Sequence, residues 1–385
     1  MKHICFVLDS YPTKTNNGCV FAKHLIWAIA DKGYKCTVIA PTPITADSIK
    51  NRKEFEKKRV DVTDAGSNIE VYTPYYLHLS SNKSFMKTSM NNHYKATLKI
   101  LKNNKINPDV MYGHFIYQCG LTVARIGEKF GIPSYCACGE NSLRLEKNSH
   151  PYCTGLKYCD WHNILDLLSG IVSVSKNNST LLIENNFIDK DKKIKVFPNG
   201  INSKKFFVMS KEKARKELSI PMDRFIVAFT GTFKESKGVL ELSEALKNCD
   251  NTYSLFMGKG ELKPDCKNIL FCGSVPNDKL HLYLNAADVF VLPTKGEGCC
   301  NAIVEALACG LPVISSDLPF NDDILDETNS IRIDVTSVKE IEEAIKKLQN
   351  DRDLLARLSD GAKASSKNLS IEKRAENILR FMELI

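Results

Sequence analysis

Apolar positions in the first half of the chain fall into short runs that alternate with segments of helical spacing. The short runs are residues 4–8, 36–40, 110–112, 133–137 and 171–174. The helical segments are residues 21–30 and 121–130. Strands that alternate with helices of this length predict a parallel sheet covered on both faces.

The second half repeats this alternation. Strand-like runs occur at 225–230, 254–257, 269–272, 289–292 and 313–315, and helical segments at 240–246, 281–286 and 301–309. Between the halves, VFPNG (196–200) is a turn signal. We predict an α/β fold of two doubly wound, Rossmann-like domains that face each other across a cleft, where such folds bind ligands. The expected parts are residues 1–198, residues 199–368, and a helix over 369–385 that packs back near the linker or the first domain.

Composition agrees with a soluble protein of this size. The chain has 385 residues, of which 43% are hydrophobic and 25% charged, and no apolar run approaches the length of a membrane span. The apolar start is too brief for a signal peptide, so a cytoplasmic location is expected. The 14 cysteines lie mostly in apolar runs and should be reduced and buried. Cys136 and Cys138, and likewise Cys299 and Cys300, lack the spacing of a zinc site.

The net charge of +8 is unevenly distributed. Residues 1–200 hold 27 Lys and Arg against 17 Asp and Glu, a net +10, whereas residues 201–385 hold 26 against 28, a net −2. If residues 90–103 form a helix, an apolar stripe broken by Thr97 lies beside three lysines: the stripe is Tyr94, Leu98 and Leu101, and the lysines are Lys95, Lys99 and Lys102. A solvated helix is the simpler interpretation. Contact with an anionic membrane surface or acceptor is the alternative, and no nucleic-acid partner is expected.

The segment KGEGCCNAIVEALACG (295–310) combines a predicted strand end, a glycine turn and a short helix. Backbone amides at a helix start lack intrahelical partners and favour a phosphate, and Gly298 allows close approach. The amides expected to bind it belong to Cys299, Cys300 and Asn301.

Glu297 in the turn could hold sugar hydroxyls, and Glu305 in the helix could accept hydrogen bonds from a ribose. Eight helical steps span about 12 Å, more than the roughly 5–9.5 Å between the carboxylates of a glycoside hydrolase. A hydrolytic pair is therefore disfavoured. A solvated turn residue and a surface helix residue are the alternatives for Glu297 and Glu305.

With its two glutamates separated by seven residues, this segment resembles the signature of glycosyltransferase family 4. Further stretches resemble that family in the same order: Asn17-Gly18, DVMYGHF (109–115), FPNGIN (197–202) with Phe206, GTFKESKG (231–238), FMGKG (256–260) and FCGSV (271–275). The resemblance spans nearly the whole chain and implies a GT-B fold, a nucleotide-sugar donor and retention of anomeric configuration.

The resemblance also implies site residues. Lys237 could neutralise a departing diphosphate and, with Glu297 and His114, would be catalytic. A solvated lysine and a hydrogen-bonded structural histidine are the alternatives. Further donor contacts would come from Gly18, Thr232, Gly258, Val275, Gly298, Cys299, Cys300, Asn301 and Glu305.

Three departures from the family affect these expectations. Thr232 replaces the usual arginine of the phosphate loop, the N-terminal glycine pair is reduced to Asn17-Gly18, and Cys138 replaces a histidine. Glu140 thereby becomes a candidate contact for a sugar hydroxyl, and Asn17 is a second candidate on the acceptor side.

We therefore predict a retaining glycosyltransferase of bacterial polysaccharide biosynthesis. It would move a hexose from a UDP-sugar, or less favourably a GDP-sugar, to a glycan or lipid-linked acceptor, and could be peripheral at the inner membrane face. No metal is expected, because Lys237 and the helix amides supply positive potential; the D-x-D strings at 189–191 and 351–353 are interpreted as surface turns. A nucleotide-sugar epimerase of the same fold and a catalytically weak nucleotide-binding module remain the alternatives.

Overall fold

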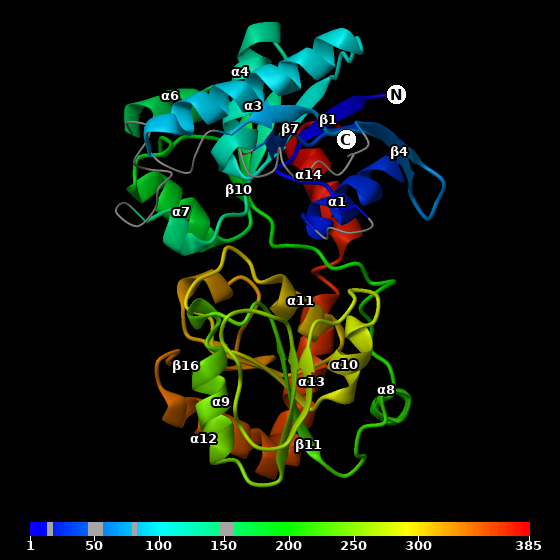
Figure 1. Cartoon of the computed structure of the whole chain (residues 1–385), viewed down its shortest axis with the longest axis vertical. Coiled ribbons are helices and arrows are strands. Elements are labelled where there is room, and N and C mark those ends of the chain that lie inside the picture. Colours follow the sequence, from blue (N-terminus) through cyan, green and yellow to red (C-terminus); the bar gives the residue numbers. More distant parts are fainter. Residues whose placement is uncertain (14–17, 45–56, 79–82, 147–157) are drawn as a thin grey trace. The chain divides into compact units, whose positions relative to one another are not determined.

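The computed structural model divides into two compact units. It describes residues 1–13, 18–44, 57–78, 83–146 and 158–385. Unit 1 comprises Met1–Pro198 and Glu372–Ile385, and unit 2 comprises Asn199–Ile371. Figure 1 labels the elements of both units. Each unit is a sheet covered by helices, which confirms the predicted α/β class.

The main sheet of unit 1 has the strand order β10-β9-β8-β7-β1-β2-β5-β4. Every pairing is parallel except β4 with β5. The strands are β1 (His3–Val7), β2 (Lys35–Ile39), β4 (Lys58–Val62), β5 (Asn68–Tyr72), β7 (Val110–His114), β8 (Ser134–Cys138), β9 (Gly170–Ser173) and β10 (Ile194–Val196). A separate parallel pair is formed by β3 (Thr42–Ile44) and β6 (Tyr75–Leu77). The strand order reverses between β1 and β7, so this is the switch point of the sheet, where such folds bind ligands.

Burial explains which strands of unit 1 the sequence pattern revealed. All residues of β1, β7 and β8 are buried, as expected for central parallel strands. The edge strand β4 exposes about half of Val60 and of Val62. Its sequence alternates polar and apolar residues and contains no apolar run. The antiparallel β4–β5 edge was therefore missed.

The helices of unit 1 include α3 (Lys83–Asn103), which packs against α4 (Leu121–Phe130). Thr97, expected to interrupt the apolar stripe, is buried and donates a hydrogen bond to the carbonyl oxygen of His93. Lys95, Lys99 and Lys102 are exposed. The remaining helices are α1 (Val20–Ala30), α6 (Tyr158–Asp166), α7 (Lys176–Glu184) and α14 (Ile371–Phe381), with short helical turns at Ile116–Gly120 and Ser142–Arg144.

Unit 2 contains a fully parallel sheet of order β13-β12-β11-β14-β15-β16. This is the strand order of a dinucleotide-binding Rossmann sheet, with its switch point between β11 and β14. Its strands are β11 (Phe225–Thr230), β12 (Thr252–Met257), β13 (Ile269–Gly273), β14 (Val289–Leu292), β15 (Val313–Ser316) and β16 (Ser330–Ile333). Its helices are α8 (Lys211–Leu218), α9 (Val239–Lys247), α10 (Leu280–Ala286), α11 (Asn301–Ala308), α12 (Val338–Asn350) and α13 (Arg352–Ser366), with turns at Glu235–Lys237 and Pro319–Asn321.

The end of the chain returns to unit 1 as α14, drawn in red in Figure 1. Arg374 is buried and donates hydrogen bonds to the carbonyl oxygens of Phe197 and Pro198. Phe381 stacks edge-on against Tyr135 of β8, with ring centroids 5.7 Å apart. Helix α14 is thus an integral part of the packing of unit 1.

The described cysteines are free thiols and mostly buried, as predicted. The interpretation of 351–353 as a surface turn was wrong, because Asp351 caps α13 and accepts a hydrogen bond from the amide of Leu354. A carboxylate at a helix start is stabilising, and the sequence pattern missed α13 altogether.

Candidate active site

Lys237 and Glu297 meet at the switch point of unit 2. Lys237 ends the short turn after β11, Glu297 lies in the loop after β14, and the ammonium forms an ion pair with Oε1 of the carboxylate. Gly238 makes this approach possible. It has a φ of +66°, and a Cβ at this position would lie 2.2 Å from the carbonyl oxygen of Pro293. Glycine is the residue that tolerates both conditions.

The ion pair is largely shielded from water, since 17% of the Lys237 side chain and 13% of the Glu297 side chain are exposed. Burial opposes the charge on Lys237, but the neighbouring Glu297 carboxylate outweighs it and raises the pKa of the ammonium. Thr294 donates a hydrogen bond of 3.1 Å to Oε1 of Glu297 and is itself completely buried. The lysine is therefore a fixed positive charge, held where a strand ends.

The first backbone amides of α11 lie next in sequence to this pair. Cys300 is the N-cap residue, and its side chain makes no capping hydrogen bond. The N–H groups of Cys300, Asn301 and Ala302 donate to no acceptor within the part of the chain that the structure describes. Uncapped amides at the positive end of a helix favour an anion.

Asn199 holds this loop in place. Its side-chain amide donates to the carbonyl oxygen of Cys299 at 3.1 Å, and its backbone N–H lies 3.3 Å from the Cys299 sulfur. The sequence marks FPNG as a turn and as part of the family resemblance, but neither assigns Asn199 a contact, so this role of Asn199 was missed, as was that of Thr294. The contact of Asn199 joins residues 100 positions apart, and that of Thr294 joins residues three positions apart. Both depend on where the side chains point, which the sequence does not show.

Glu305 lies on α11, partly buried. Burial raises the pKa of its carboxyl to about 8, with Lys205 acting in the opposite direction. Among the described residues, none donates a hydrogen bond to this carboxyl or forms an ion pair with it. Glu305 is therefore available to accept hydrogen bonds from hydroxyl groups of a ligand.

The raised pKa of Glu305 predicts a pH-dependent stability. Between the ordinary pKa of 4.5 and about 8, the folded chain retains a proton that the unfolded chain has lost, so stability falls as pH rises. We expect Glu305→Gln to flatten this decline by at most about 1.4 kcal/mol per pH unit. Urea unfolding between pH 5 and 8 measures it. Glu343→Gln, at an exposed position of α12, is the matched control; equal slopes in wild type and Glu305→Gln would contradict the prediction.

The predicted phosphate loop and glycine turn pack directly together. A Cβ on Gly258 would lie 1.9 Å from the carbonyl oxygen of Gly231, and one on Gly260 would lie 2.2 Å from that of Phe233. Thr232 is exposed between these contacts, and Val275 is half-buried just after β13. Thr232 follows β11, Gly258 follows β12 and Val275 follows β13. All three therefore lie at the carboxyl ends of strands.

His114 ends β7 at the switch point of unit 1. It is buried, with its ring 5.0 Å from that of Phe21 and 4.8 Å from that of Phe115. Burial, assisted by the positive charge of Arg374, lowers the pKa of His114 to about 3. The imidazole is therefore neutral near pH 7. Gly18 is partly buried in the turn before α1, and Asn17 lies outside the described residues.

Glu140 is buried just after β8, with 6% of its surface exposed. Its Oε1 accepts hydrogen bonds from the backbone amides of Ile116 and Tyr117, at 2.5 and 3.4 Å. Burial raises the pKa of this carboxyl to about 7 despite these amides. In this structure the Glu140 carboxyl therefore supports the segment that follows β7. The sequence-based expectation for Glu140 was a contact with a sugar hydroxyl and did not include this support.

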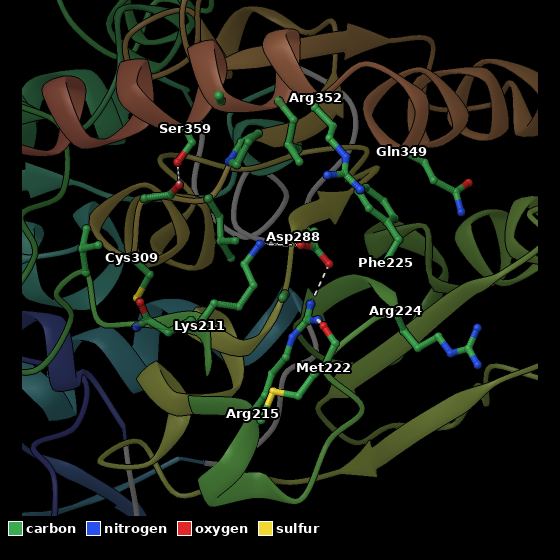
Figure 2. A pocket seen from close by; sticks show the side chains of 18 of the residues that line it. Lys211, Arg215, Met222, Arg224, Phe225, Asp288, Cys309, Gln349, Arg352 and Ser359 are labelled. Carbon is green, nitrogen blue, oxygen red and sulfur yellow. Dashed lines mark hydrogen bonds and ion pairs between the residues drawn. The ribbon is translucent and has the colours of Figure 1, made fainter. Parts of the chain in front are cut away.

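Unit 2 also contains a hollow of about 670 Å³ beside the amino ends of β11 and β14. Figure 2 shows Lys211 and Arg215 pointing at Asp288 within it. Arg215 additionally donates to the carbonyl oxygen of Met222, so this cluster ties α8 to the sheet. The hollow contains none of the predicted site residues.

Comparison with known proteins decides what kind of unit carries the Lys237–Glu297 pair. A family model described as "Glycosyl transferases group 1" matches residues 210–365. Unit 2 carries a glycosyl transferases group 1 domain. This group 1 domain contains Thr232, Lys237, Gly258, Val275 and the whole segment from Glu297 to Glu305, whereas His114 and Glu140 lie outside the matched residues.

Relatives match the chain well beyond the group 1 domain. TuaC of Bacillus subtilis (strain 168), a glycosyltransferase assigned to teichuronic acid biosynthesis, is 26% identical over 357 residues, covering 91% of this chain and 90% of TuaC. Sucrose-phosphate synthase from Thermosynechococcus elongatus superimposes with a TM-score of 0.79 at 15% identity, covering 100% of this chain and 99% of that chain. Anabaena HepE in complex with UDP-glucose gives a TM-score of 0.71 at 14% identity, covering 100% of both chains. The chain has the GT-B fold, as predicted.

Within the described residues, every helix is too short or too polar to span a bilayer.

Proposed function

We propose that this chain is a retaining glycosyltransferase that moves a hexose from a UDP-sugar to a glycan or lipid-linked acceptor in bacterial polysaccharide biosynthesis. The observation that carries the proposal is the Lys237–Glu297 pair beside the uncapped amides of α11, at the switch point of the group 1 domain. The UDP-glucose complex of HepE, which has the same fold, supports UDP as the nucleotide.

In the proposed complex, the donor diphosphate binds the amides of Cys300 and Asn301. Lys237 stabilises the charge that develops on the leaving diphosphate as the glycosidic bond breaks. Glu305 accepts hydrogen bonds from the ribose, and Glu297 holds hydroxyls of the transferred sugar. These four groups come from two loops and one helix of a single unit, so their geometry is set before the donor binds.

Retention is proposed through displacement on one face of the sugar, with the leaving phosphate taking the proton of the acceptor hydroxyl. Such a reaction needs no separate carboxylate base. His114 is neutral near pH 7 and could accept a hydrogen bond from a sugar hydroxyl rather than donate as a cation. The positive charge of Lys237 and the α11 amides serves the role that a metal serves in other transferases.

The acceptor is proposed to bind unit 1, and polysaccharide biosynthesis is inferred from the likeness to TuaC. The exposed Lys95, Lys99 and Lys102 of α3 would suit an anionic surface, which supports a peripheral location at the cytoplasmic face of the membrane.

A donor panel tests the proposal. The full chain is incubated with UDP- and GDP-sugars, with and without glycan and lipid-linked acceptors, and released nucleotide and anomeric configuration are measured. A UDP-sugar consumed with retention is expected. Tight UDP-sugar binding without transfer would indicate the catalytically weak module, an alternative that the neutral side chain of Thr232 favours. Interconversion of donor sugars would indicate the epimerase. Failure to sediment with anionic vesicles at low salt would contradict the membrane contact.

A further inference from the structure

Three side chains of metal-binding type converge at the switch point of unit 1: Asp9, His93 and Cys119. Asp9 follows β1, His93 lies on α3, and Cys119 lies in the segment after β7. One possible ligand atom from each lies within 4.8 Å of the other two. The Cys119 sulfur donates to Oδ1 of Asp9 at 3.0 Å. Their wide separation in sequence explains why no motif indicated the cluster.

His93 points to a ligand independently of the other two residues. It is fully buried, and its Nε2 has no hydrogen-bond partner among the described residues. Buried polar nitrogens are rarely left in this state. Its Nδ1 lies 2.8 Å from the hydroxyl oxygen of Thr122. With the Nδ1 proton donated to Thr122, Nε2 presents a lone pair, which is how metal-binding histidines are usually oriented.

Backbone geometry around Cys119 is unusual in the same place. Phe115 has a φ of 74° and Gln118 a φ of 57°, so two non-glycine residues adopt the left-handed region within one short segment. A Cβ on Gly113 would lie 2.9 Å from the carbonyl group of Cys119. Such conformations persist where surrounding packing enforces them, and they are concentrated at ligand sites. Here they bring the thiol to Asp9.

We propose that Asp9, His93 and Cys119 bind one divalent cation of the zinc type, with water as the fourth ligand. Nitrogen, thiolate and carboxylate ligands together suit zinc, whereas magnesium and calcium prefer oxygen alone. Binding converts the Cys119 thiol to a thiolate and releases its proton to solvent. Tetrahedral zinc places ligand atoms about 3.4–3.6 Å apart, so no pair of ligand atoms needs to approach by more than about 1.4 Å. Asp9 is exposed and gives the ion access from solvent.

The ion would join three parts of unit 1, the end of β1, helix α3 and the segment after β7. This role is structural and separate from the donor chemistry proposed for Lys237 and Glu297, for which no metal is invoked. The two proposals can therefore fail independently.

The test uses the full chain, stripped with a chelator and kept reduced, then titrated with Zn²⁺ and Co²⁺. We expect one ion bound per chain by elemental analysis, a thiolate-to-cobalt charge-transfer band, and a higher melting temperature with Zn²⁺. Cys119→Ser should remove the band. Thr122→Val should keep the band but weaken binding about 10–100-fold, as loss of a supporting hydrogen bond does.

Cys36→Ser is the matched control, because Cys36 is a buried thiol on β2 of the same unit and should leave binding unchanged. If Cys119→Ser does not fold, Asp9→Asn replaces it, and at least tenfold weaker binding is expected. Binding of clearly less than one Co²⁺ per chain would overturn the proposal. A thiolate-to-cobalt band that survives in Cys119→Ser would also overturn it. So would unchanged affinity in Asp9→Asn, which would leave Cys119 as only a hydrogen-bond donor to Asp9.

Discussion

Lys237→Ala is expected to lower kcat/KM for sugar transfer by about 10²–10³-fold, the range found when one preorganised group that stabilises transition-state charge is removed. The ammonium is held by Glu297 and is little exposed, so in the proposed complex it would approach the diphosphate without first losing much bound water. Because its stabilisation grows as the leaving group gains charge, kcat should fall more than KM rises. Initial rates over a range of UDP-sugar concentrations measure both.

Lys295→Ala provides the matched control. Lys295 lies two residues from Glu297 in the same loop, but pairs with Glu235 and Glu241. Its loss should leave kcat/KM within about twofold, because ion pairs at such positions contribute little. Melting temperatures of both variants establish that the group 1 domain remains folded. Equal activity of Lys237→Ala and wild type, with folding intact, would refute the role assigned to the ammonium.

Gly258→Ala is expected to destabilise unit 2 by about 3 kcal/mol or more, the upper range for overpacking a tight interior. The added methyl group would lie 1.9 Å from the carbonyl oxygen of Gly231. This is a backbone atom, so the clash cannot be relieved by a change of side-chain rotamer. Because Gly231 opens the loop that leads to Lys237, nucleotide binding should weaken as well. Urea unfolding and UDP titration measure the two effects.

Gly273→Ala is the control for this substitution. A Cβ on Gly273 would meet only the Phe271 ring, at an ordinary 3.5 Å, although Gly273 pairs with β12 next to Gly258. Its unfolding midpoint should stay near that of wild type. If the two alanine variants unfold at the same urea concentration, the close approach of the two loops in unit 2 is not a constraint on the fold.

Much of unit 2 could be predicted because its strands are short apolar runs. The runs at 225–230 and 289–292 match β11 and β14 in full. Parallel strands buried on both faces have this pattern, and chemistry at their carboxyl ends follows from topology alone. The position of Lys237 and Glu297 on neighbouring loops could thus be anticipated.

Contacts made by side chains could not be anticipated in the same way. The sequence gives no sign that Lys237 and Glu297 pair with each other across 60 residues, or that Glu140 turns inward to the amides of Ile116 and Tyr117. These contacts depend on loop conformations such as the left-handed turn at Gly238. Amphipathic α12 and the capped α13 were missed because their buried apolar residues are spaced among charged ones and form no continuous apolar run.

The place of α14 in unit 1 has a consequence for protein synthesis. Unit 2 is one uninterrupted stretch, so it can fold as soon as it has left the ribosome, while unit 1 must wait for residues 372–385. Until Arg374 arrives, the carbonyl oxygens of Phe197 and Pro198 lack this donor, and Phe381 has yet to cover Tyr135. The half of the chain translated first is therefore the half completed last, which reverses the usual order of domain folding.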